Sequence, residues 1–258
     1  MLRAGLVQMR VDYHPFKSML NRYFAGYVGG ASRPVFFDVE ATCPGLAALT
    51  RSYPAIREEC DRVLALRAGL PRYHEIDPGE AAISAAGDPD RRWTVFLLYI
   101  LGHRPARNRA LCPRTCRVLD GVTGLTQAFF SILDPGKSIP LHEGPYLGYL
   151  RYHLALRVPA ENPPRLVVSG REHVWREGQA LLFDDTWPHE VVNHGTEVRA
   201  VLIVDVLRPL PFWPSLANRL VARGLVGPTY GRAVARRAER RSAAPAAAGA
   251  PAGRRRAA

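Results

Sequence analysis

Two histidines stand where a short strand-like run meets a turn. His142 follows the Asp134-Pro-Gly turn and a short apolar run, and His189 follows the apolar segment 178–183 and an acidic turn. Imidazole suits iron(II) while leaving coordination positions open. Two imidazoles 47 positions apart (189 − 142) can converge on opposite strands of a jelly roll. A lone pair is weak evidence, because histidine is more often a surface group or a hydrogen-bonded core residue.

A second group with chemical potential lies on the segment from Tyr149 to Val158, which we expect to form a strand. Side chains alternate between the two faces of a strand, so Arg151 and His153 fall on one face. The other face belongs against a core because it is apolar, with Leu150, Tyr152, Leu154, Leu156 and Val158. The face with Arg151 and His153 points either into a ligand cavity or toward solvent.

A series of motifs in one order resembles the aspartyl/asparaginyl β-hydroxylase family, which includes animal aspartyl hydroxylases and bacterial relatives that act on acyl chains of lipid A. The resemblance covers Trp93 to Pro211. It rests on His142-Glu-Gly-Pro, Leu150-Arg-Tyr-His-Leu, Trp175-Arg-Glu-Gly, Phe183-Asp-Asp-Thr-Trp-Pro-His-Glu, Arg199-Ala-Val-Leu-Ile-Val-Asp-Val and the following Arg208-Pro. It implies a mainly β fold with a double-stranded β-helix core (jelly roll, cupin-like) and flanking N-terminal helices.

The resemblance also implies a 2-oxoglutarate-dependent dioxygenase that uses Fe(II) and O2. Its iron ligands would be His142 and His189. The cosubstrate 2-oxoglutarate would be held by Ser131, Arg151, His153 and Arg199. This agrees with elementary chemistry, because a dicarboxylate needs a cation at its distal end and an Arg199 guanidinium offers a bidentate fork. Decarboxylation of the cosubstrate to succinate would accompany hydroxylation of an unactivated carbon.

One position departs from the general pattern of such oxygenases. Gly144 stands two residues after His142, where a facial triad would supply a carboxylate. The resemblance implies the same gap in the animal enzymes. Adjacent Glu143 should point away from the metal, since side chains alternate along a strand. Water completes the coordination in the interpretation we favour, and the alternative is help from Asp184 or Asp185, which could equally be plain turn residues.

The substrate is less well specified. The first expectation is the β-carbon of an aspartyl or asparaginyl residue or a related amino acid. The alternatives are a lipid acyl chain of the lipid A type and a non-catalytic jelly-roll binding module. Animal aspartyl hydroxylases carry an arginine two residues before the position of Arg151, whereas this chain has Tyr149. The stretch around Tyr149 looks closer to the lipid-modifying branch, but those enzymes tend to have His-x-Asp where this chain has His142-Glu-Gly144.

Net charge separates the chain into a nearly balanced body and a basic end. The total is +12 over 258 residues, and ten arginines against one acid in residues 219–258 contribute +9, which leaves 12 − 9 = +3 for the rest. Nucleic-acid binders usually spread charge along a face, so we expect no nucleic-acid partner. The basic, aromatic segment around Trp213, Arg219 and Arg223 is suited instead to peripheral contact with an anionic membrane.

Four scattered cysteines fit a reducing cytoplasm better than a disulfide framework, and no apolar run has the length of a signal or membrane segment. We expect cytoplasmic localisation, with peripheral contact at the inner membrane face as an option.

Hydrophobic spacing and turn residues predict three regions: an irregular or helical region 1–92, a β-rich domain 93–211, and a basic helix with a disordered tail in 212–258. The resemblance implies that the β-rich domain is a jelly-roll oxygenase domain. Within the first, helical spacing covers 44–70 and a loop covers 71–92. The expected strands are 93–101, 126–133, 149–158, 165–169, 173–176, 180–183, 189–193 and 198–207, and a further helix is expected over 213–225.

Overall fold

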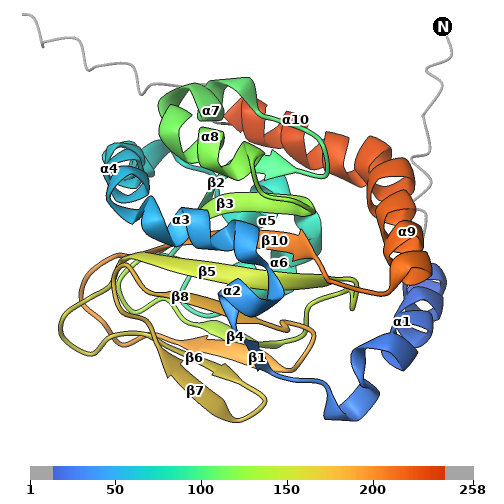
Figure 1. Ribbon diagram of the computed structural model, residues 1–258. Helices are drawn as coiled ribbons and strands as arrows, with labels where there is room; N and C mark the ends of the chain where they lie inside the picture. The colour runs from blue at the N-terminus through green and yellow to red at the C-terminus, as the bar shows by residue number, and fades with distance from the viewer. Residues whose placement is uncertain (1–13, 242–258) are drawn as a thin grey trace, which may run out of the picture.

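The computed structural model describes residues 14–241, in which two antiparallel β-sheets face each other and helices cover the outer side of the larger sheet (Figure 1). The larger sheet has the order β1 (Phe36–Phe37), β8 (Ala180–Phe183), β5 (Tyr149–Arg157), β10 (Arg199–Leu207), β3 (Leu125–Leu133) and β2 (Trp93–Ile100). The smaller has the order β4 (Ile139–His142), β9 (His189–Val192), β6 (Arg165–Val168) and β7 (Arg171–Val174). This arrangement confirms the predicted jelly-roll core.

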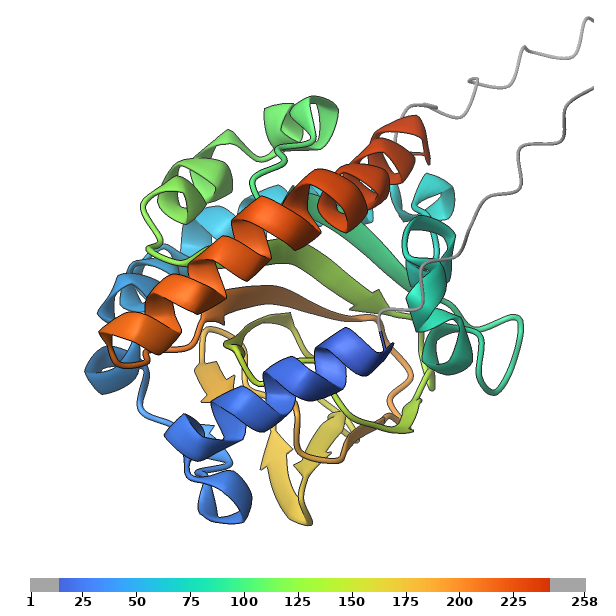
Figure 2. The same ribbon diagram turned by 90° about the vertical axis from the view of Figure 1, so that its right-hand side faces the viewer.

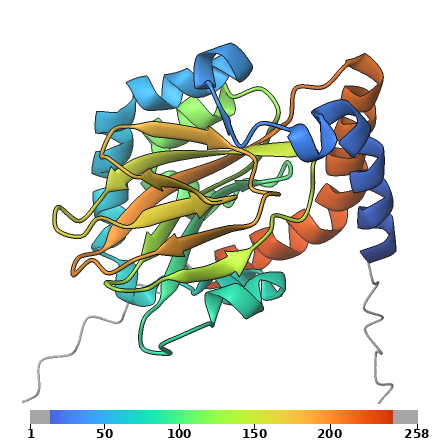
Figure 3. The ribbon, with the colours of Figure 1, turned by 90° about the horizontal axis from the view of Figure 1, so that it is seen from below.

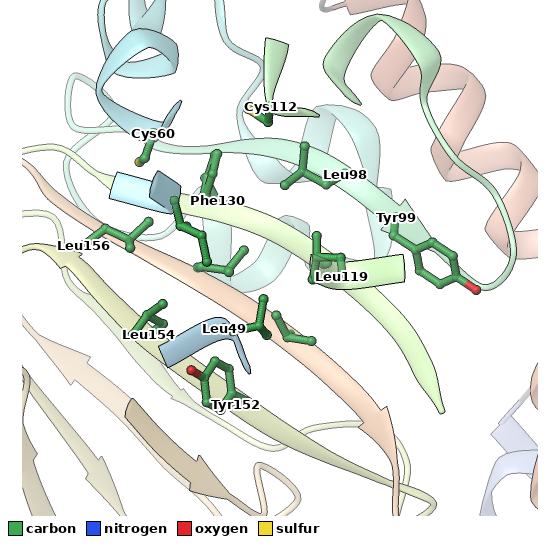
Figure 4. Close-up of a cluster of buried hydrophobic side chains, with 14 of the residues drawn as sticks. Leu49, Cys60, Leu98, Tyr99, Cys112, Leu119, Phe130, Tyr152, Leu154 and Leu156 are labelled. Atoms are coloured by element: carbon green, nitrogen blue, oxygen red, sulfur yellow. The ribbon is translucent and has the colours of Figure 1, made fainter. Parts of the chain in front are cut away.

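The alternation of β5 assigns its two faces as the sequence predicts. Leu150, Tyr152 and Leu154 are fully buried under the helical layer, in one cluster with Leu49, Leu119 and other apolar side chains. Figure 4 labels Tyr152 and Leu154 within this cluster. Ala155 belongs instead to the core between the two sheets. Each fully buried aliphatic or aromatic side chain contributes roughly 1.5–3 kcal/mol. Two separate cores therefore hold β5 in place and fix where Arg151 and His153 point.

The helices divide into a group that packs on the larger sheet and a group that lies along one side. The first supplies Leu49, Cys60 and Leu119 to the core. It comprises α2 (Val39–Thr42), η2 (Pro44–Leu46), α3 (Ala47–Arg51), α4 (Tyr53–Leu64), η3 (Arg67–Gly69), α7 (Ala106–Leu111) and α8 (Pro113–Asp120). The short helices α5 (Tyr73–Ile76), η4 (Pro78–Glu80) and α6 (Ala81–Ser84) lie instead beside β2 and β4, and α5 contributes Tyr73 and Ile76 to the core between the sheets. Pro54 stands in the first turn of α4, where its missing amide hydrogen costs nothing.

The second group consists of the two ends of the described chain. It comprises α1 (His14–Val28), followed by the 3-10 turn η1 (Gly30–Ser32), and a continuous rod of α9 (Phe212–Leu220), the π-helical segment η5 (Val221–Gly231) and α10 (Arg232–Arg241). Figure 2 shows α1 and this rod on the same side of the molecule, and Figure 3 shows α1 next to the start of the rod. None of the helices in residues 14–241 meets the length and hydropathy needed to cross a bilayer.

Several sequence expectations need correction. The segment 71–92 is not a plain loop, because α5, η4 and α6 form within it, and the strand expected at 173–176 lies two residues earlier as β7. The helix expected at 213–225 continues through η5 and α10 to Arg241. Helices α7 and α8 had no counterpart in the predicted elements. The disordered tail expected from 242 onward lies outside the described residues.

Candidate active site between the two sheets

The two predicted iron ligands meet on the smaller sheet. His142 and His189 are directly paired across the antiparallel strands β4 and β9, and their ring centroids lie 4.1 Å apart. Nδ1 of His142 lies 2.8 Å from the carbonyl oxygen of Pro140, and Nδ1 of His189 lies 2.9 Å from that of Trp187. A carbonyl only accepts hydrogen bonds, so each Nδ1 carries the proton and each Nε2 keeps its lone pair. This is the tautomer that a metal ligand requires.

Burial keeps both imidazoles uncharged. It lowers the pKa of His142 and the pKa of His189 to about 4 each. Within residues 14–241 no set of three or more His, Cys, Asp or Glu side chains is arranged to hold a metal. A metal ion held by these two imidazoles alone would keep open coordination positions, unlike a metal in a closed structural site.

The carboxylate of Asp185 lies against Gly144, two residues after His142 in the chain. A Cβ built on Gly144 would lie 2.5 Å from Cγ of Asp185, and the Gly144 amide donates to the Asp185 carbonyl at 2.7 Å. Only glycine leaves room for this approach. Asp185 is fully buried, and its Oδ1 has no hydrogen-bond partner among the described residues. An unpartnered buried carboxylate oxygen is costly, so a missing ligand is the natural partner for it.

Asp185 belongs to a charged network built around Arg151. The Arg151 guanidinium forms a bidentate pair with Asp205, at 2.8 and 2.9 Å, and approaches Oδ2 of Asp185 at 3.0 Å. Tyr149 donates to the same Oδ2 at 2.8 Å. Burial raises the pKa of Asp185 and the pKa of Asp205, because removal from water disfavours the charged carboxylates. The charge of Arg151 opposes this effect and favours the ionised form of both carboxylates.

Arg199 is a buried arginine whose charge is not balanced by a carboxylate of the described residues. Its side chain is buried on β10, and among residues 14–241 no carboxylate pairs with it. It donates from Nη1 to Ser131 Oγ at 3.3 Å, its guanidinium carbon lies 4.2 Å above the ring of Trp175, and its Nε has no partner. Burial alone lowers its pKa to about 9. A buried, unpaired guanidinium is expensive unless an anion joins it.

His153 lies between Arg199 and the pair of His142 and His189. Its ring stacks on Trp175 with centroids 5.9 Å apart and meets Phe183 edge-on at 5.0 Å, while Phe183 in turn meets His189 at 5.9 Å. Both ring nitrogens of His153 are buried without a hydrogen-bond partner. Burial, and then the Arg199 charge, hold its pKa well below 6.5. His153 therefore presents a neutral imidazole with unfilled hydrogen-bonding capacity.

The structure gathers the predicted residues between the two sheets, with the His pair on the smaller sheet and Ser131, Arg151, His153 and Arg199 on the larger one. Ser131 also accepts from Trp93 Nε1 at 3.0 Å. Arg151 differs from Arg199 because two carboxylates already pair with it, so its role toward a cosubstrate stays a prediction. Two further side chains contact the site without having been predicted as site residues: Trp175, whose ring lies against Arg199 and His153, and Tyr149, which donates to Asp185.

Asp184 and Asp185 are neighbours with separate tasks. Asp184 forms ion pairs with Arg33 at 2.9 Å and Arg208 at 2.6 Å, and it accepts a hydrogen bond from the Thr186 amide. These contacts join the segment before β1 and the segment after β10 to the turn that precedes His189. Asp184 is therefore a structural residue, and Asp185 is the one that faces Gly144.

The fold and the paired histidines define a jelly-roll protein with a candidate metal-binding site between its sheets. The sequence pattern of the aspartyl/asparaginyl β-hydroxylases matches residues 50–209. The chain belongs to this hydroxylase family, as the motif resemblance predicts.

Two curated relatives illustrate the range of the family. An ornithine lipid ester-linked acyl 2-hydroxylase from Rhizobium tropici is 38% identical over 204 residues, 75% of this chain and 71% of the relative. The aspartyl/asparaginyl β-hydroxylase of Homo sapiens is 31% identical over 166 residues, 62% of this chain but only 21% of the human protein. Among solved structures, a cupin domain of a transcriptional regulator from Enterobacter cloacae covers 32% of this chain and 82% of its own, at 16% identity and a TM-score of 0.28.

Proposed function

We propose that the protein is an Fe(II)- and 2-oxoglutarate-dependent dioxygenase that hydroxylates the acyl chain of a lipid. The observation that carries the oxygenase assignment is Arg199, a buried cation without a carboxylate partner among the described residues, whose guanidinium packs on the same Trp175 ring as the unpartnered imidazole of His153. A dicarboxylate would satisfy both groups, and a 2-oxo acid would at the same time reach the imidazole pair.

Each side chain has a task in this proposal. Arg199 and Ser131 bind the distal carboxylate of 2-oxoglutarate, and the Trp175 ring fixes the plane of the guanidinium. Neutral His153 donates a hydrogen bond toward the oxo-acid end. His142 and His189 would hold iron(II) through Nε2, and the bound metal would supply O2 activation. Asp185 accepts a hydrogen bond from a water at the position that Gly144 leaves open.

Two observations support a lipid substrate over an aspartyl or asparaginyl residue. The Rhizobium tropici relative, which is named for an acyl 2-hydroxylase, aligns over 71% of its length, against 21% for the human protein. Tyr149 stands where the animal enzymes would carry an arginine, and its hydroxyl is occupied by Asp185. A substrate carboxylate would find no free cation at that position.

The test is Fe(II)-dependent formation of succinate by the purified protein, measured with acyl lipids, ornithine-containing lipids and aspartyl or asparaginyl peptides added in turn. His142→Ala and His189→Ala should each abolish succinate formation, whereas His194→Ala, which changes an exposed loop histidine, should leave it unchanged. Stimulation by a lipid supports the proposal. Stimulation by a peptide alone would contradict the substrate assignment, and no succinate with iron bound would contradict the oxygenase.

A further inference from the structure

Helix α9 presents an apolar stripe to solvent. Phe212 is 72% exposed and Trp213 is 73% exposed, and Leu216 and Leu220 continue the same helical face one and two turns further on. Such large apolar side chains are seldom left so exposed in a group. The opposite side of α9 is buried through Pro214 and Asn218, so the exposed stripe is not needed to hold the helix on the body.

Helix α1 carries a matching stripe on the same side of the molecule (Figure 2). Met19, Tyr23 and Tyr27 are spaced four residues apart, lie on one face and are 42–58% exposed. The inward side chains Phe24 and Asn21 anchor the helix instead. Tyrosine and tryptophan favour the boundary between water and hydrocarbon, because one end of each ring is apolar and the other can hydrogen-bond.

The charge around both stripes is of one sign. No acidic residue occurs in 14–37 or in 206–238. Arg22, Arg219 and Arg223 are exposed and have no carboxylate partner among the described residues. Arg223 also lines a pocket of about 320 Å³ with Arg232 and His103, which could receive an anionic head group. A surface that combines apolar stripes with unpaired arginines is complementary to an anionic bilayer.

The two stripes flank the loop that leads out of the active site. Residues 143–148 join His142 to β5, and Asn21 of α1 binds this loop by donating to Pro145 O at 3.1 Å and accepting from the Leu147 amide at 3.0 Å. From the other side, Asn218 of α9 accepts from Tyr146 Oη at 2.7 Å and donates to Gly148 O at 2.6 Å. The helices that carry the stripes therefore hold the segment that starts at an iron-ligand candidate.

We infer that α1 and α9 form a membrane-docking face that seats on an anionic lipid bilayer and brings acyl chains to the site between the sheets. The occupant is a bilayer rather than a second copy of the chain, because two copies of a protein with charge +12 would bring unpaired arginines against each other. Docking itself is argued from the exposed residues, whereas delivery of an acyl chain to the iron site rests on the proposed function.

Trp213 offers a direct readout. Of the four tryptophans, Trp93 and Trp175 are buried and Trp187 is half-buried, so Trp213 is the one exposed to water. We expect vesicles of phosphatidylcholine with phosphatidylglycerol to sediment the protein and shift its tryptophan emission to shorter wavelength. Pure phosphatidylcholine vesicles should bind much less. Raising the salt concentration should weaken binding, since charged contacts at the surface are screened.

Two variants test the two components of the face. Phe212→Ser with Trp213→Ser should weaken binding to anionic vesicles by about a hundredfold or more, the effect of withdrawing two large side chains from an apolar phase. Arg219→Glu with Arg223→Glu should weaken it by at least about tenfold, because two attractive charges become repulsive. The matched control is Leu66→Ser with Leu111→Ser, which changes exposed leucines near α4 and α7 and should leave binding unchanged.

All these substitutions are at exposed positions, and unchanged thermal unfolding will show that the fold is intact. Equal binding by the control and the α9 variants, or no binding to anionic vesicles, would overturn the inference. Sedimentation as a dimer that the α9 variants dissociate would assign the face to a second copy and also overturn it. Succinate formation with a detergent-dispersed lipid is measured separately, so a failure of docking and a failure of the oxygenase are distinguishable.

Discussion

The carboxylate of Asp185 fills the space into which a side chain at Gly144 would grow: a Cβ at Gly144 would lie 2.7 Å from Oδ2 of Asp185. The two residues come from different strand ends and are joined by the hydrogen bond from the Gly144 amide to the Asp185 carbonyl. The chain thus brings a carboxylate to the region of the absent third ligand from a position far along the sequence.

This relationship predicts coupling between the two positions. Gly144→Ala should displace the Asp185 carboxylate and lower the affinity for Fe(II) by about tenfold or more, the usual effect of disturbing a group that orients a metal site. Asp185→Gly should itself weaken metal binding. The double variant should be less impaired than the product of the two single effects, because removing the carboxylate relieves the clash. Isothermal titration with Fe(II) or Co(II) measures the metal affinity of the three variants. If the loss of affinity in the double variant equals the product of the two single losses, the two positions are not coupled and the prediction is wrong.

We expect the buried charge of Arg199 to lower the stability of the protein and to strengthen the binding of 2-oxoglutarate. Arg199→Met removes a buried unpaired charge, so we expect the free energy of unfolding without cosubstrate to rise by roughly 1–2 kcal/mol. The same change should weaken 2-oxoglutarate binding by about 100-fold, because a charge-assisted bidentate contact is lost. Arg165→Met, which changes an exposed arginine paired with Glu172, should leave cosubstrate affinity unchanged. A strongly destabilised Arg199→Met would show that the guanidinium already has a partner.

The sequence predicted the strands well where one face of a strand is buried and the other has a distinct character. On β5 the alternation identified both the core face and the position of Arg151 and His153. The paired histidines and the uncompensated Arg199 were predicted as site residues because their motifs resemble those of a family. Their distances follow only from the pairing of β4 with β9 and of β10 with β3.

Other features depend on tertiary contacts that local patterns do not encode. The ion pairs of Arg151 with Asp205 and Asp185 join residues 54 and 34 positions apart (205 − 151, 185 − 151), so they appear only when the strands are registered. The short helices in 71–92 form in a segment rich in glycine, proline and aspartate, and they are held by packing of Tyr73 and Ile76 against the core. The continuation through η5 includes Pro228, a residue that argues locally against any helix.

The free energy of unfolding should depend on pH because of the buried carboxyl of Glu80. Burial, followed by the negative charge of Asp77, raises the pKa of Glu80 from 4.5 to about 7. The folded state holds this proton more tightly than the unfolded state. The protonated Glu80 side chain therefore contributes fully to the free energy of unfolding below pH 4.5, and this contribution is lost as the pH rises to 7. Glu80→Gln cannot ionise and should therefore gain stability over the wild type across that window, by about 3 kcal/mol at pH 8.

Denaturant unfolding of both proteins at pH 4.5 and pH 8 measures the difference. Asp88→Asn, which changes an acid paired with Arg91 on an exposed turn, is the matched control and should show no such gain. A Glu80→Gln variant that gains equally at both pH values would contradict the burial of an ionisable carboxyl.

Asn218 should couple the C-terminal rod to the site. Asn218→Ala removes the acceptor for Tyr146 Oη and the donor to Gly148 O, both within buried surroundings, and should cost about 1–3 kcal/mol of unfolding free energy. The loop that begins after His142 then loses its anchor, so turnover should fall more than the fraction of folded protein does. Ser215→Ala on the same helix is the control. Equal turnover per folded molecule would contradict the anchoring role.

The central claim is that oxygen from O2 enters an acyl chain in a reaction that uses the site between the sheets. The direct measurement is a reaction under labelled ¹⁸O2 with an acyl lipid, Fe(II) and 2-oxoglutarate, followed by mass spectrometry of the lipid and of succinate. We expect one labelled oxygen atom in the acyl chain and one in succinate, and neither product with His142→Ala. An unmodified lipid, or a hydroxyl whose oxygen comes from water, would contradict it.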